Sequence, residues 1–188
     1  VTSRGPFEAP VLVNCAGAGA DTFAAFLGEP VPLELMVPMM MVTQPVAPFV
    51  EPVVLAATRR LSFKQHPNGT VLIGGGHRAE GDRETETIRL DFAKLALSAR
   101  IVMDFFPFLK DVRVVRAWAG LEARMPDDIP VIGPSGTAPG VFHAFGFTGH
   151  GFQLGPIVGR ILADLITEGR TDLPIEPFRI ERFSMASS

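Results

Sequence analysis

Near its end the sequence reads Gly146-Phe147-Thr148-Gly149-His150-Gly151-Phe152-Gln153-Leu154-Gly155-Pro156, and an amphipathic segment follows directly. Three glycines in the first six positions leave backbone amides uncovered by side chains. Such amides at the start of a helix can bind an anionic or polar group. A tight crossover from a strand to a helix would also need glycine for steric reasons alone, and the spacing fits both interpretations. His150 is expected to be exposed, either as a ligand contact or as an ordinary surface histidine.

The sequence on either side of this segment predicts two strands before it and a helix after it. The closing helix is predicted from about Gly155 to Thr167, with Pro156 in its first turn and Gly169 as its C-terminal cap. Short strands are predicted over residues 130–133 and 141–144, on either side of a loop rich in proline and glycine. The end of the chain is therefore expected to run strand, glycine loop, helix.

The beginning of the chain predicts a similar unit. Residues 11–14 are an apolar run, typical of a fully buried strand, and Cys15 is expected to be buried with it. A turn then leads to a short helix over residues 23–27, with Asp21 and Thr22 as its cap. The pair Gly17 and Gly19 is not a dinucleotide-binding fingerprint, because Thr22 stands where the third glycine belongs.

Between these ends the sequence predicts an antiparallel series of strands and one long helix. Strands are expected over residues 36–43, 53–58, 61–66, 70–73 and 112–118. Asn68-Gly69 predicts a hairpin between two of them, because both residues tolerate a positive φ. Apolar residues at steps of three and four predict a helix from Thr85 to Phe106.

This order of elements indicates an α+β fold. Residues 1–34 and 126–188 are expected to form the two parts of one α/β domain. Residues 35–125 are expected to form a lobe inserted into it, with a mixed, largely antiparallel sheet and the long helix.

Composition excludes several classes of function. A net charge of −3 and the lack of a Lys/Arg run argue against nucleic-acid binding. No apolar stretch reaches the ~18–20 residues that span a bilayer, and no signal peptide is visible, so a cytoplasmic protein is expected. The four histidines lack metal-ligand spacing, which predicts no metal site. No serine stands in a nucleophile elbow, which leaves hydrolysis without support.

Five segments in order resemble the D-amino-acid oxidase-like family of FAD-dependent amine oxidoreductases, which includes glycine oxidase, sarcosine oxidases, opine oxidase and hydroxyproline dehydrogenase subunits. The segments are Val11-Leu12-Val13-Asn14-Cys15-Ala16-Gly17, Gly69-Thr70-Val71-Leu72-Ile73-Gly74-Gly75, Trp118-Ala119-Gly120-Leu121, Pro126-Asp127-x-x-Pro130-Val131-Ile132-Gly133 and Gly146-Phe147-Thr148-Gly149-His150-Gly151. Their order and spacing are similar to the C-terminal half of that family over nearly the whole chain.

The resemblance implies an FAD domain interrupted by a substrate domain, and hydride transfer from an amine-bearing carbon of a small amine or amino acid to the flavin. It implies that no side-chain base is needed if the substrate amine arrives neutral, and no catalytic side chain is assigned. It places the cofactor near Ala16 and Gly17 and along the loop Gly146, Phe147, Thr148, Gly149, His150, Gly151, Phe152 and Gln153. It also implies that the whole FAD site needs an N-terminal segment, and it points to partner subunits of a heteromeric dehydrogenase.

Two departures from the family pattern concern the substrate. Glycine oxidase-like members have an arginine directly after the Trp-Ala-Gly-Leu segment, where this chain has Glu122, and a second arginine where it has Gly149. Arg124 could replace the first, and Glu122 could meet a cationic amine or a partner subunit. With Thr148 and His150 these form the expected substrate contacts. The alternative is a non-catalytic binding or assembly module that keeps only the substrate-domain fold.

Overall fold

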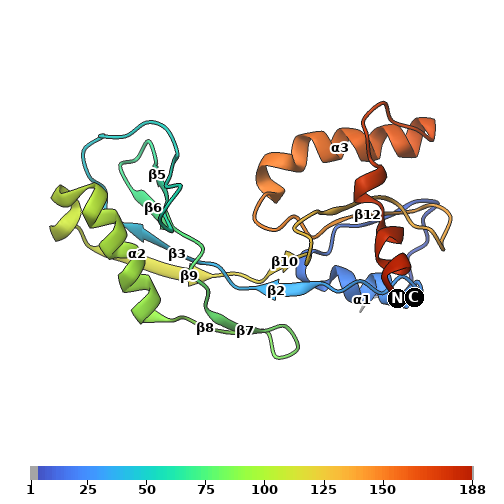
Figure 1. Ribbon diagram of the computed structural model, residues 1–188, viewed down its shortest axis with the longest axis horizontal. Helices are drawn as coiled ribbons and strands as arrows, with labels where there is room; N and C mark the ends of the chain where they lie inside the picture. The colour runs from blue at the N-terminus through green and yellow to red at the C-terminus, as the bar shows by residue number, and fades with distance from the viewer. Residues whose placement is uncertain (1–3, 188) are drawn as a thin grey trace. The chain divides into compact units, whose positions relative to one another are not determined.

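The computed structural model describes residues 4–187, so residues 1–3 and 188, at the ends of the first and last predicted segments, lie outside it. The fold is α+β, with two compact units that we describe separately (Figure 1). The first unit holds the residues up to Leu35 together with those from Glu122 onward, and the second holds Met36–Leu121. The expected second boundary lay after residue 125, whereas the structure divides between Leu121 and Glu122. Glu122 and Arg124 therefore belong to the first unit.

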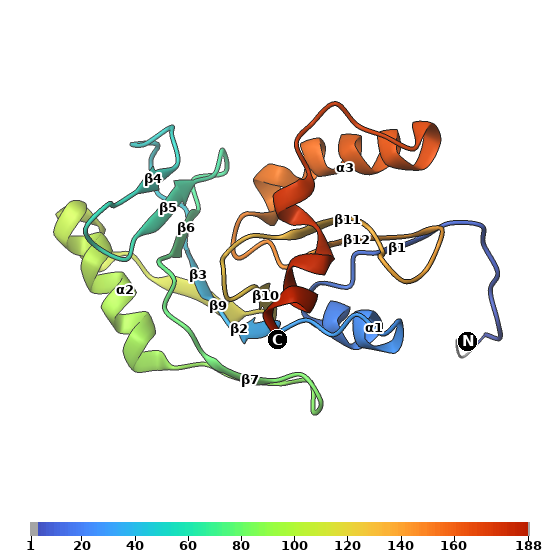
Figure 2. The ribbon, with the colours of Figure 1, turned by 45° about the vertical axis from the view of Figure 1, so that its right-hand side comes forward.

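The first unit is built on a three-stranded sheet in which β1 (Leu12–Asn14) lies beside β12 (Val141–Phe145), and β12 lies beside β11 (Val131–Pro134). Figure 2 shows these strands side by side. The pair β1–β12 is parallel, with Asn14 opposite His143, and the pair β11–β12 is antiparallel. Both strands predicted beside the proline- and glycine-rich loop are confirmed.

Helices cover both faces of this sheet. Successive residues of β12 point to opposite faces, so neighbouring residues of this strand contact different helices. Ala144 packs with Val158 and Ile161 of α3 (Gly151–Glu168), whereas Phe145 packs with Ala20 and Ala24 of α1 (Ala20–Phe26). Figure 1 shows α3 and α1 on opposite sides of β12. The 3₁₀ turns of this unit are η1 (Gly17–Gly19), η3 (Glu176–Phe178) and η4 (Ile180–Ser187).

Both helices differ from their predicted starts. α3 begins four residues earlier than expected, so Pro156 lies in its second turn instead of its first. Pro156 has no N–H, so it gives no hydrogen bond to the carbonyl of Phe152. α1 begins at Ala20, which puts Asp21 inside the first turn, where its carboxylate accepts from the amide of Thr22 at 2.8 Å. The C-terminal cap at Gly169 is confirmed, with φ of +71°.

Two expectations about the first strand are wrong. Leu12 and Val13 are 43% and 37% exposed, so the strand is not fully buried, and Cys15 is exposed. The reason is topological, since β1 stands at the edge of its sheet. An apolar run alone does not distinguish a central strand from an edge strand.

The second unit holds a five-stranded antiparallel sheet in the order β4-β5-β6-β3-β9. Its strands are β3 (Met39–Thr43), β4 (Val54–Leu55), β5 (Ser62–Gln65), β6 (Val71–Gly74) and β9 (Val114–Ala119). The predicted hairpin is confirmed, because β5 and β6 pair across Asn68-Gly69, where Gly69 has φ of +85°. A β-carbon there would also lie 2.7 Å from the carbonyl oxygen of Val46.

The long helix is shorter than predicted. α2 runs over Phe92–Phe105, capped by the Asp91 carboxylate, which accepts from the amide of Lys94 at 3.0 Å. The preceding residues form a hairpin of β7 (Glu80–Asp82) and β8 (Thr87–Arg89), and the turn η2 (Pro107–Asp111) follows the helix. Val102 of α2 belongs to the core with Phe63 and Ile73 of the sheet.

Candidate functional site: the glycine loop and the start of helix α3

The glycine loop (residues 146–150) joins β12 to α3 through three residues with positive φ: Gly146 at +74°, Thr148 at +49° and Gly149 at +83°. A β-carbon at Gly146 would lie 2.5 Å from Cγ of Met125, a residue that is fully buried. The left-handed conformation is uncommon for a β-branched residue such as Thr148. Backbone of this kind persists only where neighbouring structure holds it.

That neighbour is β10 (Glu122–Arg124), which pairs with β2 (Glu34–Met36). The amide of Thr148 donates to the carbonyl of Ala123 at 3.2 Å, and its hydroxyl accepts from the amide of Met125 at 3.3 Å. The amide of Gly149 donates to the carboxylate of Glu122. The structure therefore brings Glu122, Thr148 and Gly149 together, and the amides of Thr148 and Gly149 are engaged by the protein itself.

The amides left to face a ligand are those of the first turn of α3. The amide of His150 donates to the carbonyl of Phe147 at 2.9 Å, and its exposed side chain does not cap the helix. Gly151, Phe152 and Gln153 lie too early in the helix to donate to an intrahelical carbonyl. The expected row of ligand-facing amides thus shortens to these three residues, at the positive end of an 18-residue helix.

An apolar pocket of about 310 Å³ lies against this helix start. It is lined by Cys15, Gly17, Ala144, Phe145, Phe147, Gly151, Gly155, Val158, Gly159 and Leu162. Gly151, Gly155 and Gly159 stand four residues apart, on one face of α3. A β-carbon built at Gly17, Gly155 or Gly159 would meet no atom within 4 Å, so glycine there leaves open space that a side chain would fill.

Only some of the predicted cofactor residues line this pocket. Gly17, Phe147 and Gly151 do so. Ala16 does not, and its amide donates to the side-chain oxygen of Asn14 at 3.3 Å. Phe152 is fully exposed. Sequence reasoning missed Gly155 and Gly159, although their spacing from Gly151 was the signal that could have identified them.

Arg124, the predicted carboxylate contact, is held by two acidic residues. Its guanidinium lies 2.7 Å from the carboxylate of Glu34 and 3.0 Å from that of Asp128. Hydrogen bonds to these two groups raise the pKa of Arg124 further. Its charge is therefore already balanced, which favours a structural role for this side chain.

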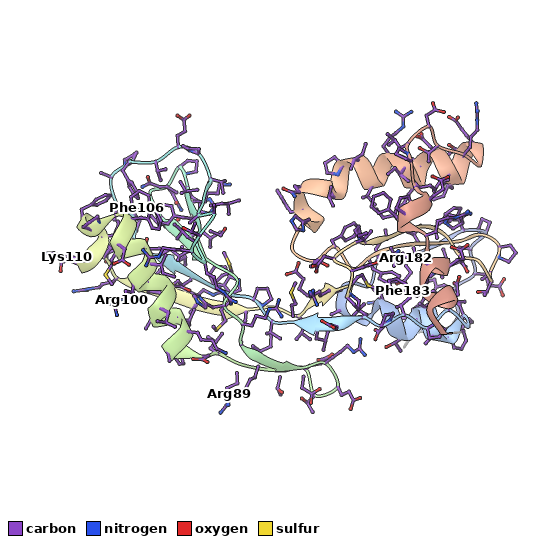
Figure 3. The ribbon with its side chains drawn as sticks, viewed as in Figure 1. Arg89, Arg100, Phe106, Lys110, Arg182 and Phe183 are labelled. Atoms are coloured by element: carbon purple, nitrogen blue, oxygen red, sulfur yellow. The ribbon has the colours of Figure 1, made fainter. Side chains whose placement is uncertain are left out.

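The turn over residues 126–128, which follows β10 and contains two aspartates, is held in place by Arg182 near the end of the chain. Arg182 lies 2.9 Å from the carboxylate of Asp127 and donates to the carbonyl of Ile129 at 2.6 Å. Its guanidinium also lies over the ring of Phe183, 4.2 Å from the centroid (Figure 3). The turn is thus a fixed part of the first unit.

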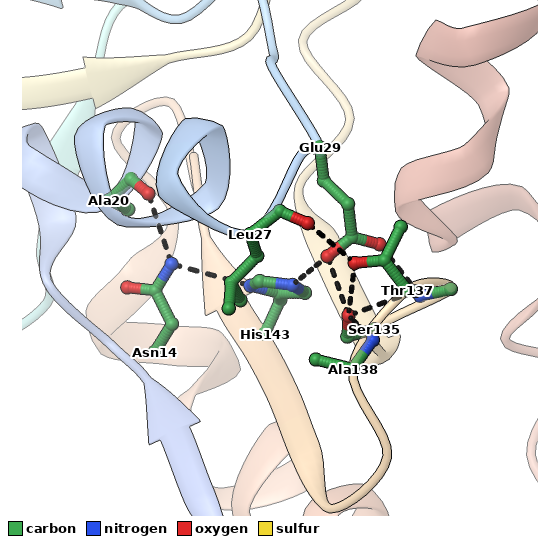
Figure 4. Close-up of polar contacts among 9 residues, drawn as sticks. Asn14, Ala20, Leu27, Glu29, Ser135, Thr137, Ala138 and His143 are labelled. Carbon is green, nitrogen blue, oxygen red and sulfur yellow. Dashed lines mark hydrogen bonds and ion pairs between the residues drawn. The ribbon is translucent and has the colours of Figure 1, made fainter.

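A buried polar network, which sequence reasoning missed, connects β1, β12 and the residues after α1 (Figure 4). Asn14, Glu29 and His143 are buried, and hydrogen bonds connect them with Ser135. Polar residues beside apolar ones, such as Asn14 and His143, were the available signal in the sequence. The interacting residues are too far apart in the sequence for a local pattern to reveal their contacts.

Residues 4–187 hold neither a metal centre nor a membrane-spanning helix. Within that range no group of three or more His, Cys, Asp and Glu side chains could hold a metal ion. Of the helices there, none has the length and apolar character needed to cross a membrane.

Comparison with known proteins connects this site to a family. Hydrogen cyanide synthase subunit HcnC of Pseudomonas protegens is 28% identical over 183 residues, and glycine oxidase of Pseudomonas aeruginosa is 31% identical over 166 residues. These alignments cover 97% and 88% of this chain but only 42% and 44% of the relatives. The chain therefore spans less than half the length of these relatives.

The structure of L-proline dehydrogenase from P. horikoshii is similar, with a TM-score of 0.88 and 29% identity. The match covers 98% of this chain and 50% of that one. The family model described as FAD dependent oxidoreductase matches residues 1–165. The chain belongs to this family of FAD-dependent oxidoreductases, as its glycine loop and ordered motifs predicted.

Proposed function

We propose that this chain forms one part of the FAD site of an enzyme that oxidises the amine-bearing carbon of an amino acid or of a secondary or cyclic amine. Sarcosine, glycine, a D-amino acid and a hydroxyproline-like compound are the candidate substrates. The observation that carries the proposal is the glycine-faced apolar pocket at the start of α3, in a chain of this family.

The residues present fit part of a flavin. Gly17, Gly155 and Gly159 leave open space beside the backbone, into which a ring system could fit. The amides of Gly151, Phe152 and Gln153, with the helix dipole, would stabilise negative charge on a reduced ring. Bound FAD would supply the acceptor for a hydride from the substrate. The protein's own contribution is then to position the ring and to exclude water from it.

The remainder of the cofactor needs further protein. A pocket of about 310 Å³ is at the lower end of the range for small-molecule sites, roughly 300–1,000 Å³. FAD is a large ligand, and this pocket suits one portion of it. We propose that a segment matching the other half of the relatives, in the same protein or in another chain, contacts the rest.

We also propose that the protein works with partner subunits. The support is that two similar proteins, HcnC of Pseudomonas protegens and sarcosine oxidase subunit beta of Rhodobacter capsulatus, are named as subunits. Light scattering on the natively purified protein tests this proposal. A mass equal to one chain would contradict it.

The main test is a visible absorption spectrum of the natively purified protein, before and after anaerobic addition of sarcosine, glycine, proline and D-alanine in turn. We expect a flavin spectrum that bleaches with at least one of these amines. A flavin spectrum that no amine bleaches would contradict amine oxidation while keeping the cofactor. A colourless protein that takes up no added FAD would contradict the proposal and favour a binding module.

A further inference from the structure

The side-chain amide of Asn14 has its orientation fixed by the backbone on both sides. Its oxygen accepts from the amide of Ala16 at 3.3 Å, and its nitrogen donates to the carbonyl of Ala20 at 3.0 Å. A carbonyl can only accept, so the nitrogen must be the donor at that contact. The turn from strand β1 to helix α1 is thus folded around one buried side chain.

The second hydrogen of this amide determines which imidazole nitrogen of His143 carries the proton. The Asn14 nitrogen lies 3.3 Å from Nδ1 of His143, so Nδ1 must accept. The proton of the neutral ring is then on Nε2, which lies 3.1 Å from the carboxylate of Glu29. His143 is fully buried, so no solvent can replace either contact.

Glu29 is in turn held by the connection between β11 and β12. Its carboxylate accepts from the hydroxyl of Ser135 and from the amide of Gly136, both at 2.6 Å. The Ser135 oxygen also accepts from the amide of Ala138 at 2.9 Å. Figure 4 shows the resulting line of contacts from this loop through Glu29 and His143 to Asn14.

The line of contacts ends at the pocket. Cys15 and Gly17, which lie on either side of the Ala16 amide held by Asn14, line its wall. We propose that Asn14, His143 and Glu29 are positioning residues, which hold the segment Cys15–Gly17 at the place where the flavin contacts it. This inference rests on the proposed FAD site, and none of the three residues is assigned a contact with the cofactor.

A simple role in stability is the alternative, and the second unit offers a matched control. Gln65 is also a buried side-chain amide, which accepts from the amide of Phe49 at 2.9 Å and donates to the carbonyl of Ala47 at 3.1 Å. It belongs to the second unit and does not line the pocket. Gln65→Ala should therefore destabilise the protein without changing the flavin site.

The experiment compares Asn14→Ala and Gln65→Ala in the FAD-loaded protein, with affinities measured by flavin fluorescence after removal and return of FAD. We expect Asn14→Ala to raise the Kd for FAD on the order of tenfold, the effect of one lost buried hydrogen bond. Gln65→Ala should leave the Kd within about twofold of wild type, since its lost hydrogen bonds serve the other unit.

Labelling of the Cys15 thiol, the only cysteine in this chain, gives a second readout. Peptide mass spectrometry follows its rate of reaction with a thiol reagent, with and without FAD. We expect FAD to slow this reaction in wild type and in Gln65→Ala, and much less in Asn14→Ala at equal FAD occupancy. Without FAD, Asn14→Ala should react faster than wild type, because the segment is no longer held.

Glu29→Gln serves as a milder variant if Asn14→Ala does not fold. An amide at this position would lose the bond from Gly136 or present a donor to Nε2 of His143, which opposes the present tautomer. We expect an intermediate rise in Kd and a change in the ¹⁵N shifts of His143. Normal Kd and Cys15 protection in both folded variants would overturn the inference alone. A wild-type protein that binds no FAD would overturn the proposed function as well.

Discussion

Glu122 stands where the family resemblance implies an arginine, and its carboxylate contacts the glycine loop. Its carboxylate accepts from the amide of Gly149, whose φ is +83°. The side chain thereby holds the glycine loop directly before α3. A contact with the amine of a substrate is another role considered for Glu122, and its second carboxylate oxygen could serve it.

Two substitutions separate these roles. Glutamine keeps an acceptor oxygen for Gly149 but has no charge, so we expect Glu122→Gln to change KM for the amine substrate little. Glu122→Ala removes the acceptor and should weaken FAD binding several-fold, because the loop is no longer held. Steady-state kinetics and FAD titration measure both effects. A strong rise in KM in Glu122→Gln would instead assign Glu122 to the substrate.

Glu29 predicts a pH dependence of stability. Burial of its carboxylate opposes ionisation, but the hydrogen bonds from Ser135, His143 and Gly136 outweigh it and lower its pKa. Because the folded pKa lies below the unfolded value, the stabilisation is complete above about pH 4.5 and is lost as the pH falls through the folded pKa.

Urea unfolding of wild type and Glu29→Gln between pH 7 and pH 3 measures this contribution. The difference in the free energy of unfolding should stay constant at high pH and decrease as the pH falls below about 4.5, the ordinary glutamate pKa. A difference that does not change over the whole range would contradict a lowered pKa.

At the scale of elements, α3 combines two faces with opposite demands. Ile161 is buried against the sheet on one face, whereas Gly155 and Gly159 line the pocket on another, beside Val158. Glycine inside a helix costs about 1 kcal/mol relative to alanine. Such a cost at two interior positions, with open space above each, is explained by a ligand that needs this space.

Gly155→Leu tests this interpretation. The substitution should raise the thermal stability of the FAD-free protein, since leucine favours the helix and meets no atom close to its β-carbon. It should nevertheless weaken FAD binding at least tenfold, because the side chain fills the pocket. Ala163→Leu, at an exposed position of α3 outside the pocket lining, is the control and should leave FAD binding unchanged. Normal FAD binding in Gly155→Leu would place the flavin elsewhere.

The same elements show what the sequence could predict. Strands with a turn signal, such as the hairpin at Asn68-Gly69, follow from local chemistry and were predicted. The start of α2 was not, because Thr85 to Leu90 contains no glycine or proline to end a helical pattern, and Ile88 fits the same spacing. That segment pairs as β8 with β7, a tertiary contact that overrides the periodicity.

The site was predictable in the same partial way. Glycine spacing pointed to the loop before α3, and the family resemblance pointed to Gly17. The engagement of the Thr148 and Gly149 amides by β10 depends on residues more than twenty positions away. The line from Asn14 through His143 to Glu29 joins parts of the chain more than a hundred positions apart. No local pattern in the sequence records such contacts.

On the scale of the whole molecule, the first unit contains both sides of the pocket, although its two parts are separated in the sequence by residues 36–121. Cys15 and Gly17 come from the first part, and the glycines of α3 come from the second. The second unit contributes no residue to this pocket lining. We propose that the second unit, with its five-stranded sheet, is the substrate domain.

The central claim is that FAD lies between the segment Cys15–Gly17 and the glycine face of α3. Hydrogen–deuterium exchange of the FAD-free and FAD-loaded protein tests it most directly, because exchange is followed for each segment. We expect FAD to slow exchange over residues 15–19 and 147–159, and to leave exchange in the sheet formed by β4, β5 and β6 nearly unchanged. Exchange over residues 15–19 and 147–159 that does not respond to bound FAD would contradict it.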